Sequence, residues 1–171
     1  MTSILTNCAL IIGVIIALGQ LWLARKSLKA DHERRKKQST IEFYHKIFES
    51  PMKLRGEIKD VFGDDHINVT DARYKDNEGL KKSITSYLSL MERFATGINM
   101  EVYDLNAFTR IAGKANADTF KRLFPIVEER RKTLSNPNLY KEFERLTENI
   151  AKERERIYPD PGKDRGKIEH S

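Results

Sequence analysis

The strongest constraint on folding is an uncharged stretch near the start of the chain. Residues 4–24 contain no Asp, Glu, Lys or Arg, although these four types make up 33% of the 171 residues. As an α-helix this segment would be about 31 Å long, which matches the hydrocarbon thickness of a bilayer. We therefore expect a transmembrane anchor at residues 4–24, preceded by a short external N-terminus at residues 1–3.

A cleaved signal peptide and a buried soluble helix are the two alternatives for this stretch. A signal peptide has a basic start, a shorter apolar core and small residues at its cleavage site. Residues 1–3 carry no basic side chain, and the bulky Trp22 follows Gly19-Gln20-Leu21 where small residues are needed. A buried soluble helix seldom excludes charge for so long. The uncleaved anchor is therefore the favoured interpretation.

A basic juxtamembrane segment at residues 25–38 follows the anchor. Its seven basic residues against two acidic ones give a net charge of +5; they are Arg25, Lys26, Lys29, Arg34, Arg35, Lys36 and Lys37. The positive-inside rule places everything after the anchor in the cytoplasm, and these side chains are expected to attract anionic lipid headgroups. The whole chain is only +6, so the rest is nearly neutral, which argues against nucleic-acid binding.

Small residues gather on one face of the predicted anchor. Ala9, Gly13 and Ala17 recur every four positions, and Gln20 lies on the same face. Such a ridge lets two helices approach closely, and Gln20 could donate a hydrogen bond across the contact. These four residues predict self-association, hence a homo-oligomer; a single helix surrounded by lipid is the alternative. Cys8 is the one cysteine, so an intramolecular disulfide is impossible.

Helical periodicity continues after the basic segment and predicts an all-α cytosolic domain of about five helices at residues 39–158. We expect two helices within 40–62 with a break near Pro51, a helix at 80–98, one capped by Asn99, one capped by Asp118, and one starting at Asn136. Residues 63–79 are polar and predict a long mobile loop. A disordered tail is expected at residues 159–171.

Three segments carry a resemblance to a known family. Residues 87–98 (YLSLMERFATGI), Arg130-Arg131 and residues 136–143 (NPNLYKEF) resemble a family of uncharacterised bacterial and prophage-borne proteins with one N-terminal anchor and a helical cytosolic domain. The resemblance covers most of the chain. It implies a single-pass protein of the bacterial inner (cytoplasmic) membrane with its N-terminus outside, and it implies no catalytic residues.

The sequence predicts no catalytic site, no metal site and no cofactor. Glu42-x-x-His45 has the spacing of one helix of a carboxylate-bridged di-iron site, but such a site needs a second copy of the motif. A phosphate-binding glycine loop, a nucleophile elbow and a Cys/His zinc spacing are also missing from the sequence. The chain is therefore not expected to be an enzyme.

One charged pair is predicted inside the domain. Arg131 falls within the apolar arc of its helix, and Glu92 lies at the edge of the apolar face of the 80–98 helix. A buried charge is costly unless it is paired, so we expect Glu92 and Arg131 to form a structural ion pair, with Arg130 as the alternative partner. The functional alternative is a polar site in a cleft.

These observations leave three hypotheses for function. The favoured one is a membrane-tethered helical module for interaction or regulation at the inner leaflet, with an unknown protein partner. The second is a membrane-associated phage-exclusion or defence effector that acts by oligomerisation. The third is an enzyme with an unrecognised site near Glu92 and Arg131.

Overall fold

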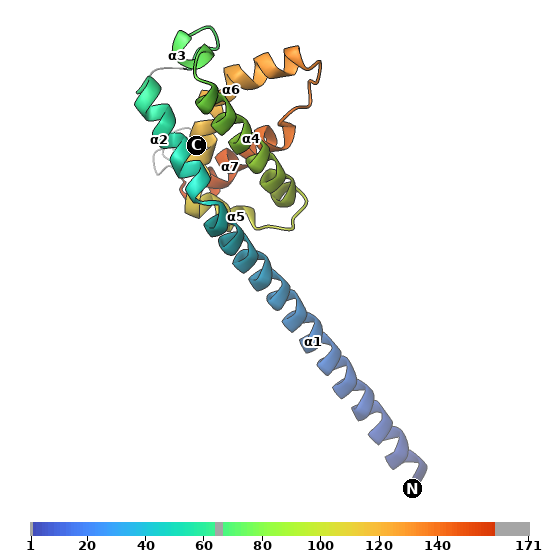
Figure 1. Cartoon of the computed structure of the whole chain (residues 1–171). Helices are drawn as coiled ribbons and strands as arrows, with labels where there is room; N and C mark the ends of the chain where they lie inside the picture. Colours follow the sequence, from blue (N-terminus) through green and yellow to red (C-terminus); the bar gives the residue numbers. More distant parts are fainter. Residues whose placement is uncertain (1, 64–66, 160–171) are drawn as a thin grey trace, which may run out of the picture. The chain divides into compact units, whose positions relative to one another are not determined.

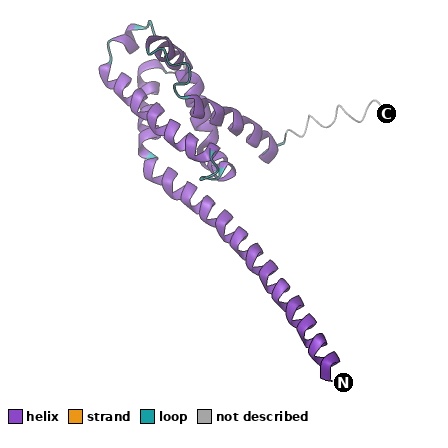
Figure 2. Ribbon diagram, turned by 90° about the vertical axis from the view of Figure 1, so that its right-hand side faces the viewer, coloured by secondary structure: helices purple, strands orange, loops and turns teal. Residues whose placement is uncertain are grey.

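In the computed structural model, residues 2–63 and 67–159 are described, without the side chains of residues 2–12 and of Val14. The described residues form helices and no strand (Figure 2), which confirms the all-α class. In chain order the elements are α1 (Thr2–Ile47), α2 (Glu49–Phe62), α3 (Ala72–Lys75), α4 (Glu78–Asn99), α5 (Leu105–Phe108), the π-helix η1 (Thr109–Gly113), α6 (Lys114–Thr133) and α7 (Lys141–Ile157) (Figure 1). The predicted tail from residue 160 onward lies outside the described residues.

The chain divides into two compact units, residues 1–38 and 39–171. Unit 1 contains most of α1, and its large apolar side chains are exposed; they are Ile15, Ile16, Leu18, Leu21, Trp22, Leu23 and Leu28. Among the described residues, no helix is both long and apolar enough to span a bilayer. The transmembrane helix predicted from the sequence therefore has no support in this part of the chain. The first half of the predicted anchor, by contrast, lies outside the described side chains.

Unit 2 is a helical bundle built around α4, which contacts α2, α3 and α7. The apolar residues of α4 recur every three or four positions, as an amphipathic helix requires, and all are buried: Leu80, Ile84, Tyr87, Leu88, Met91, Phe94, Ala95 and Ile98. This confirms the helix predicted at 80–98. Phe143, Leu146 and Ile150 of α7 complete the opposite side of the core.

An aromatic cluster joins the last residues of α1 to this core. Phe43 stacks on Phe94 with ring centroids 5.3 Å apart, and Tyr103 lies 5.2 Å from Phe94. The ring of Tyr103 also covers Gly97, where an added Cβ would come within 2.5 Å of it. Glycine at position 97 is therefore required for this close approach of ring and backbone.

The break predicted near Pro51 is present, whereas the last helix starts later than predicted. The break between α1 and α2 falls at Phe48, and Pro51 lies inside the first turn of α2, where its missing N–H costs nothing. The last helix begins at Lys141, after a turn that starts near Asn136. Proline is compatible with both the first turn of a helix and the preceding turn, so Pro51 and Pro137 could not fix these boundaries.

Predicted caps also change. Asp104, with its Oδ1 2.6 Å from the amide nitrogen of Ala107, caps α5, whereas Asn99 is the last residue of α4. Asp118 lies within α6, which continues from α5 through η1 without a break, so one helical run replaces two predicted helices. A polar residue four positions from an apolar one is found on helix surfaces as well as at helix starts. This spacing therefore does not identify a cap, which explains both errors.

The polar segment 63–79 is more ordered than expected. Ile67 is 2% exposed and belongs to the core, and Asp71 caps the short helix α3 by accepting a hydrogen bond from the Arg73 amide at 2.8 Å. The prediction of one long loop is therefore wrong for residues 67–79, while residues 64–66 lie outside the described part.

Candidate functional site

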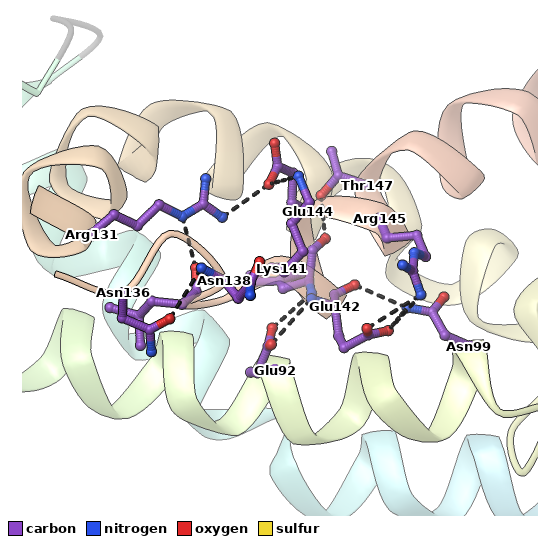
Figure 3. A network of polar contacts seen from close by, with 12 residues as sticks. Glu92, Asn99, Arg131, Asn136, Asn138, Lys141, Glu142, Glu144, Arg145 and Thr147 are labelled. Atoms are coloured by element: carbon purple, nitrogen blue, oxygen red, sulfur yellow. Dashed lines mark hydrogen bonds and ion pairs between the residues drawn. The ribbon is translucent and has the colours of Figure 1, made fainter. Parts of the chain in front are cut away.

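A network of polar contacts surrounds the N-terminus of α7 (Figure 3). Tyr140, which precedes α7, has a left-handed backbone (φ 59°) and offers no side-chain cap. Glu92 of α4 supplies the cap instead: its carboxylate accepts hydrogen bonds from the amides of Glu142 at 3.1 Å and Phe143 at 2.8 Å. An anion at this end is favourable because the free N–H groups there carry partial positive charge.

Arg131 of α6 holds the turn that leads into α7. Its Nε donates to the Leu139 carbonyl at 2.9 Å, and its Nη2 lies 2.9 Å from Oε2 of Glu144. The side chains of Arg131 and Glu144 are only 15% and 20% exposed, so this pair is largely shielded from water. Lys141 also donates to the same Glu144 oxygen at 2.9 Å. The two helices α6 and α7 are thus joined by charged contacts.

The predicted pairing of Glu92 with Arg131 is therefore corrected, since each side chain has other partners. The physical reason is that backbone groups at the start of α7 lie between α4 and α6 and offer better-placed donors and acceptors. Arg130, the predicted alternative, donates through Nη1 to the Thr85 hydroxyl at 2.8 Å. Glu92 and Arg131 nevertheless act at the same place, because both contact backbone groups at or just before the N-terminus of α7.

Asn99 completes this network from the end of α4. Its Nδ2 donates to the Glu142 carbonyl at 3.1 Å and to Glu142 Oε2 at 2.8 Å, while its Oδ1 lies 3.4 Å from Nδ2 of Asn149. Arg145 also approaches Glu142, at 3.3 Å. These groups are engaged with one another, so the network is suited to fixing helix positions.

The electrostatics of Glu144 follow from these contacts. Partial burial alone would raise its pKa, but the hydrogen bonds from Lys141 and Arg131 outweigh burial and hold the pKa below its usual value near 4.5. Glu144 is therefore ionised at neutral pH. Its role is that of an acceptor for two cations.

A second polar cluster lies within the core and has no counterpart in the sequence predictions. Asn116 of α6 is fully buried; its Oδ1 accepts from the Tyr87 hydroxyl at 3.0 Å, and its Nδ2 donates to the Tyr44 hydroxyl at 3.1 Å and to the Ala112 carbonyl at 2.9 Å. Burial raises the pKa of Tyr87. Asn116 lies four residues before Phe120, and that spacing was the available signal for an inward amide.

The other predicted site residues lie in unit 1. Gly13, Ala17 and Gln20 are exposed on α1, and the side chain of Ala9 lies outside the description. The basic residues are exposed as well, apart from the half-buried Lys36. Among the described residues, no group of three or more His, Cys, Asp or Glu side chains could hold a metal ion.

Comparison with known proteins gives one match. No curated protein and no solved structure matches the chain. The family described as Domain of unknown function (DUF4760) matches residues 7–150. This agrees with the resemblance to an uncharacterised family, although the match shows neither membrane attachment nor a prophage origin. Because it covers most of the sequence, the chain belongs to the DUF4760 family.

Proposed function

We propose that this protein is a membrane-tethered helical module for interaction or regulation, anchored by residues 4–24. The carrying observation is that the apolar side chains of α1 remain in contact with solvent: Ile15 is 63% exposed and Trp22 62% exposed. A helix that is apolar on every face is stable only when something apolar covers it, and a bilayer does so without a specific partner.

The flank of this segment supports the same proposal. Nζ of Lys26 lies 5.3 Å from the Trp22 ring centroid. Tryptophan favours the membrane interface, and a lysine one turn further along a helix can extend its ammonium into the headgroups. The basic residues of 25–37 would each gain about 1 kcal/mol near an anionic surface. This arrangement favours an N-terminus outside and unit 2 in the cytoplasm of a bacterial cell.

Unit 2 is proposed to bind a partner instead of catalysing a reaction. Its two polar clusters, at the start of α7 and around Asn116, are engaged in contacts within the fold. A catalytic centre would need polar groups that remain available to a substrate. The exposed helix surfaces of unit 2 are therefore the favoured functional part.

Oligomerisation through α1 supports a second candidate function, that of an effector controlled by self-association. Gly13, Ala17 and Gln20 are exposed, and nothing lies within 4 Å of a Cβ added at Gly13. A second helix could therefore approach this side closely. Gly13→Ile should lower self-association in a membrane two-hybrid assay, whereas Leu18→Ile should not; equal signals would remove the basis for this candidate.

Alkaline carbonate extraction of bacterial membranes tests the anchor. The full chain should stay in the pellet, and Ile16→Asp should release part of it, because an Asp at the centre of a span costs about 2.5–3.5 kcal/mol. Ile41→Asp is the matched control, since Ile41 is also exposed on α1 but lies in unit 2. Complete release of the parent chain would refute the proposal.

Protease accessibility tests the orientation. Unit 2 should be protected in intact spheroplasts and digested in inverted membrane vesicles. Digestion in spheroplasts would place the domain outside and refute the predicted topology.

A further inference from the structure

A groove of about 820 Å³ runs along the seam between α2 and α4, and the last residues of α1 close one end of it. α2 and α4 are in contact along this seam (Figure 1). Six of the lining residues are lysines or serines: Lys46, Ser50, Lys53, Lys82, Ser83 and Ser86. All of them belong to unit 2.

The groove exists because small polar residues occupy positions where a helix pair usually carries larger ones. Ser83 and Ser86 of α4 face it together with Ser50 of α2. Leu54 and Leu90 provide an apolar floor. Two packed helices gain stability by filling such a seam with apolar side chains, so an open polar seam does not serve the stability of the fold.

Positive charge in the groove is only partly compensated. Lys53 pairs with Glu57 at 3.9 Å, a contact that is largely exposed and therefore weak. Glu49 is the one acidic residue that lines this groove, and Lys82 interacts electrostatically with Glu78, which lies outside the lining. Among the described residues, Lys46 has no acidic partner. Ammonium groups that share a groove repel one another, and a bound anion would relieve that repulsion.

We propose that this groove binds a ligand that carries a phosphate group. Three ammonium groups and three hydroxyls offer more donors than one carboxylate can accept, and a phosphate would add three strong acceptor oxygens. Lysine is a common phosphate-binding residue because its ammonium acts as a mobile point charge. The floor of Leu54 and Leu90 would contact an apolar portion of the same ligand.

The local backbone adds to this preference. α2 begins beside the groove with Glu49 and Ser50, and its start has no side-chain cap. Uncapped N–H groups at the start of a helix favour anions. The helix start alone would not define a site; here it adds to the lysines and serines that line the same space.

A neighbouring groove of about 480 Å³ indicates how the ligand would be oriented in the first groove. It shares Lys53 and Ser83 with the first groove, but Glu57 and Asp60 line its other end. A phosphate at that end would be repelled. The phosphate is therefore placed at the end near Lys46 and Ser50, and the opposite end accepts the uncharged or cationic part of the ligand.

Titration with inorganic phosphate, followed by ³¹P NMR, tests the proposal on the full chain in a neutral detergent. The phosphate signal should broaden or shift, and Lys46→Ala combined with Lys82→Ala should weaken binding by about tenfold or more, because charge-assisted hydrogen bonds are roughly twice as strong as neutral ones. Ser86→Leu, which fills the groove without changing charge, should also weaken it.

Lys121→Ala combined with Lys152→Ala is the matched control, because both lysines are exposed on other helices and the net charge changes equally. This control should bind phosphate like the parent. Absence of phosphate binding by the parent, or an equal loss in the control, would overturn the proposal. Near-UV circular dichroism verifies that each variant is folded.

Vesicles of phosphatidylcholine with phosphatidic acid distinguish the two sources of phosphate. If the groove variant binds these vesicles more weakly than the control does, the ligand is a lipid headgroup. If both bind equally while phosphate binding is lost, the ligand is a soluble phosphate compound. The inorganic-phosphate experiment does not depend on the membrane anchor. Failure of the phosphate-binding proposal can therefore be distinguished from failure of the membrane-tether proposal.

Discussion

Glu92 provides the sharpest test of how unit 2 is held together, because one side chain caps a helix to which it does not belong. Loss of an ordinary N-cap costs about 0.5–2 kcal/mol, and an anion at a helix start adds about 0.3–1 kcal/mol, or up to about 2 when partly buried. Glu92→Gln keeps one acceptor and loses the charge, so we expect a loss of about 1–2 kcal/mol in the free energy of unfolding. Glu92→Ala leaves both amides of α7 without an acceptor and should cost about 2–4 kcal/mol.

Urea unfolding followed by near-UV circular dichroism is the assay, because this signal reports the packed tyrosines Tyr44 and Tyr87. Glu148→Gln is the control, since Glu148 is exposed on α7. The reasoning would be refuted if Glu92→Gln and Glu148→Gln unfolded at the same urea concentration.

A double variant separates this account from a direct ion pair. If Glu92 and Arg131 formed a pair, Glu92→Gln with Arg131→Met would recover part of the stability lost by either single change. In the structure each side chain contacts different groups, so the double variant should be less stable than both single variants. Recovery in the double variant would favour a direct pair.

Three further outcomes are expected from the same unfolding assay. Asn116→Ala should cost about 1–3 kcal/mol, because it leaves the buried Tyr44 hydroxyl without its partner and removes one of the two partners of the Tyr87 hydroxyl, the other being Thr119; a cost below that of Tyr44→Phe would contradict this. Gly97→Ala should destabilise by about 1–3 kcal/mol by displacing the Tyr103 ring, whereas Gly56→Ala, with open space around it, should stabilise by about 0.5–1 kcal/mol; equal effects would refute the packing argument. Glu144 has a lowered pKa, so its contribution is present above pH 4.5 and is lost as the pH falls through the folded pKa. The stability difference between the parent and Glu144→Gln should therefore shrink in acid, and a constant difference would contradict this.

The helical class and the interior face of α4 could be predicted because both depend on local periodicity. Leu80, Ile84 and Leu88 repeat at helical spacing, and that pattern alone requires one buried side. The boundaries of the helices were harder to predict from the sequence. Pro51 and Asn99 each suit more than one local structure, and tertiary contacts decide between them.

The partners of Glu92 and Arg131 could not be predicted from residue types. The sequence indicated two charges that need compensation, but backbone groups can compensate a charge as well as side chains can. The Glu142 amide donates to Glu92 from the first turn of α7, which follows the left-handed backbone of Tyr140. Such a turn depends on the packing of three helices, which local sequence does not encode.

The π-helix η1 has a consequence for how the sequence of this region should be aligned and altered. At 100° per residue, Phe108 and Asn116 would lie about 80° apart around the axis, yet both are buried. The wider π turn advances each residue by a smaller angle and absorbs one extra residue, which brings both side chains to the same side. Deleting one residue within 109–113 would restore a regular α-helix and leave Phe108 and Asn116 seven positions apart, about 20° around the axis, so both side chains would stay on the buried side. Forcing the present sequence into a regular α-helix without a deletion would instead rotate Phe108 relative to α6, so the π turn is what keeps the two buried faces aligned.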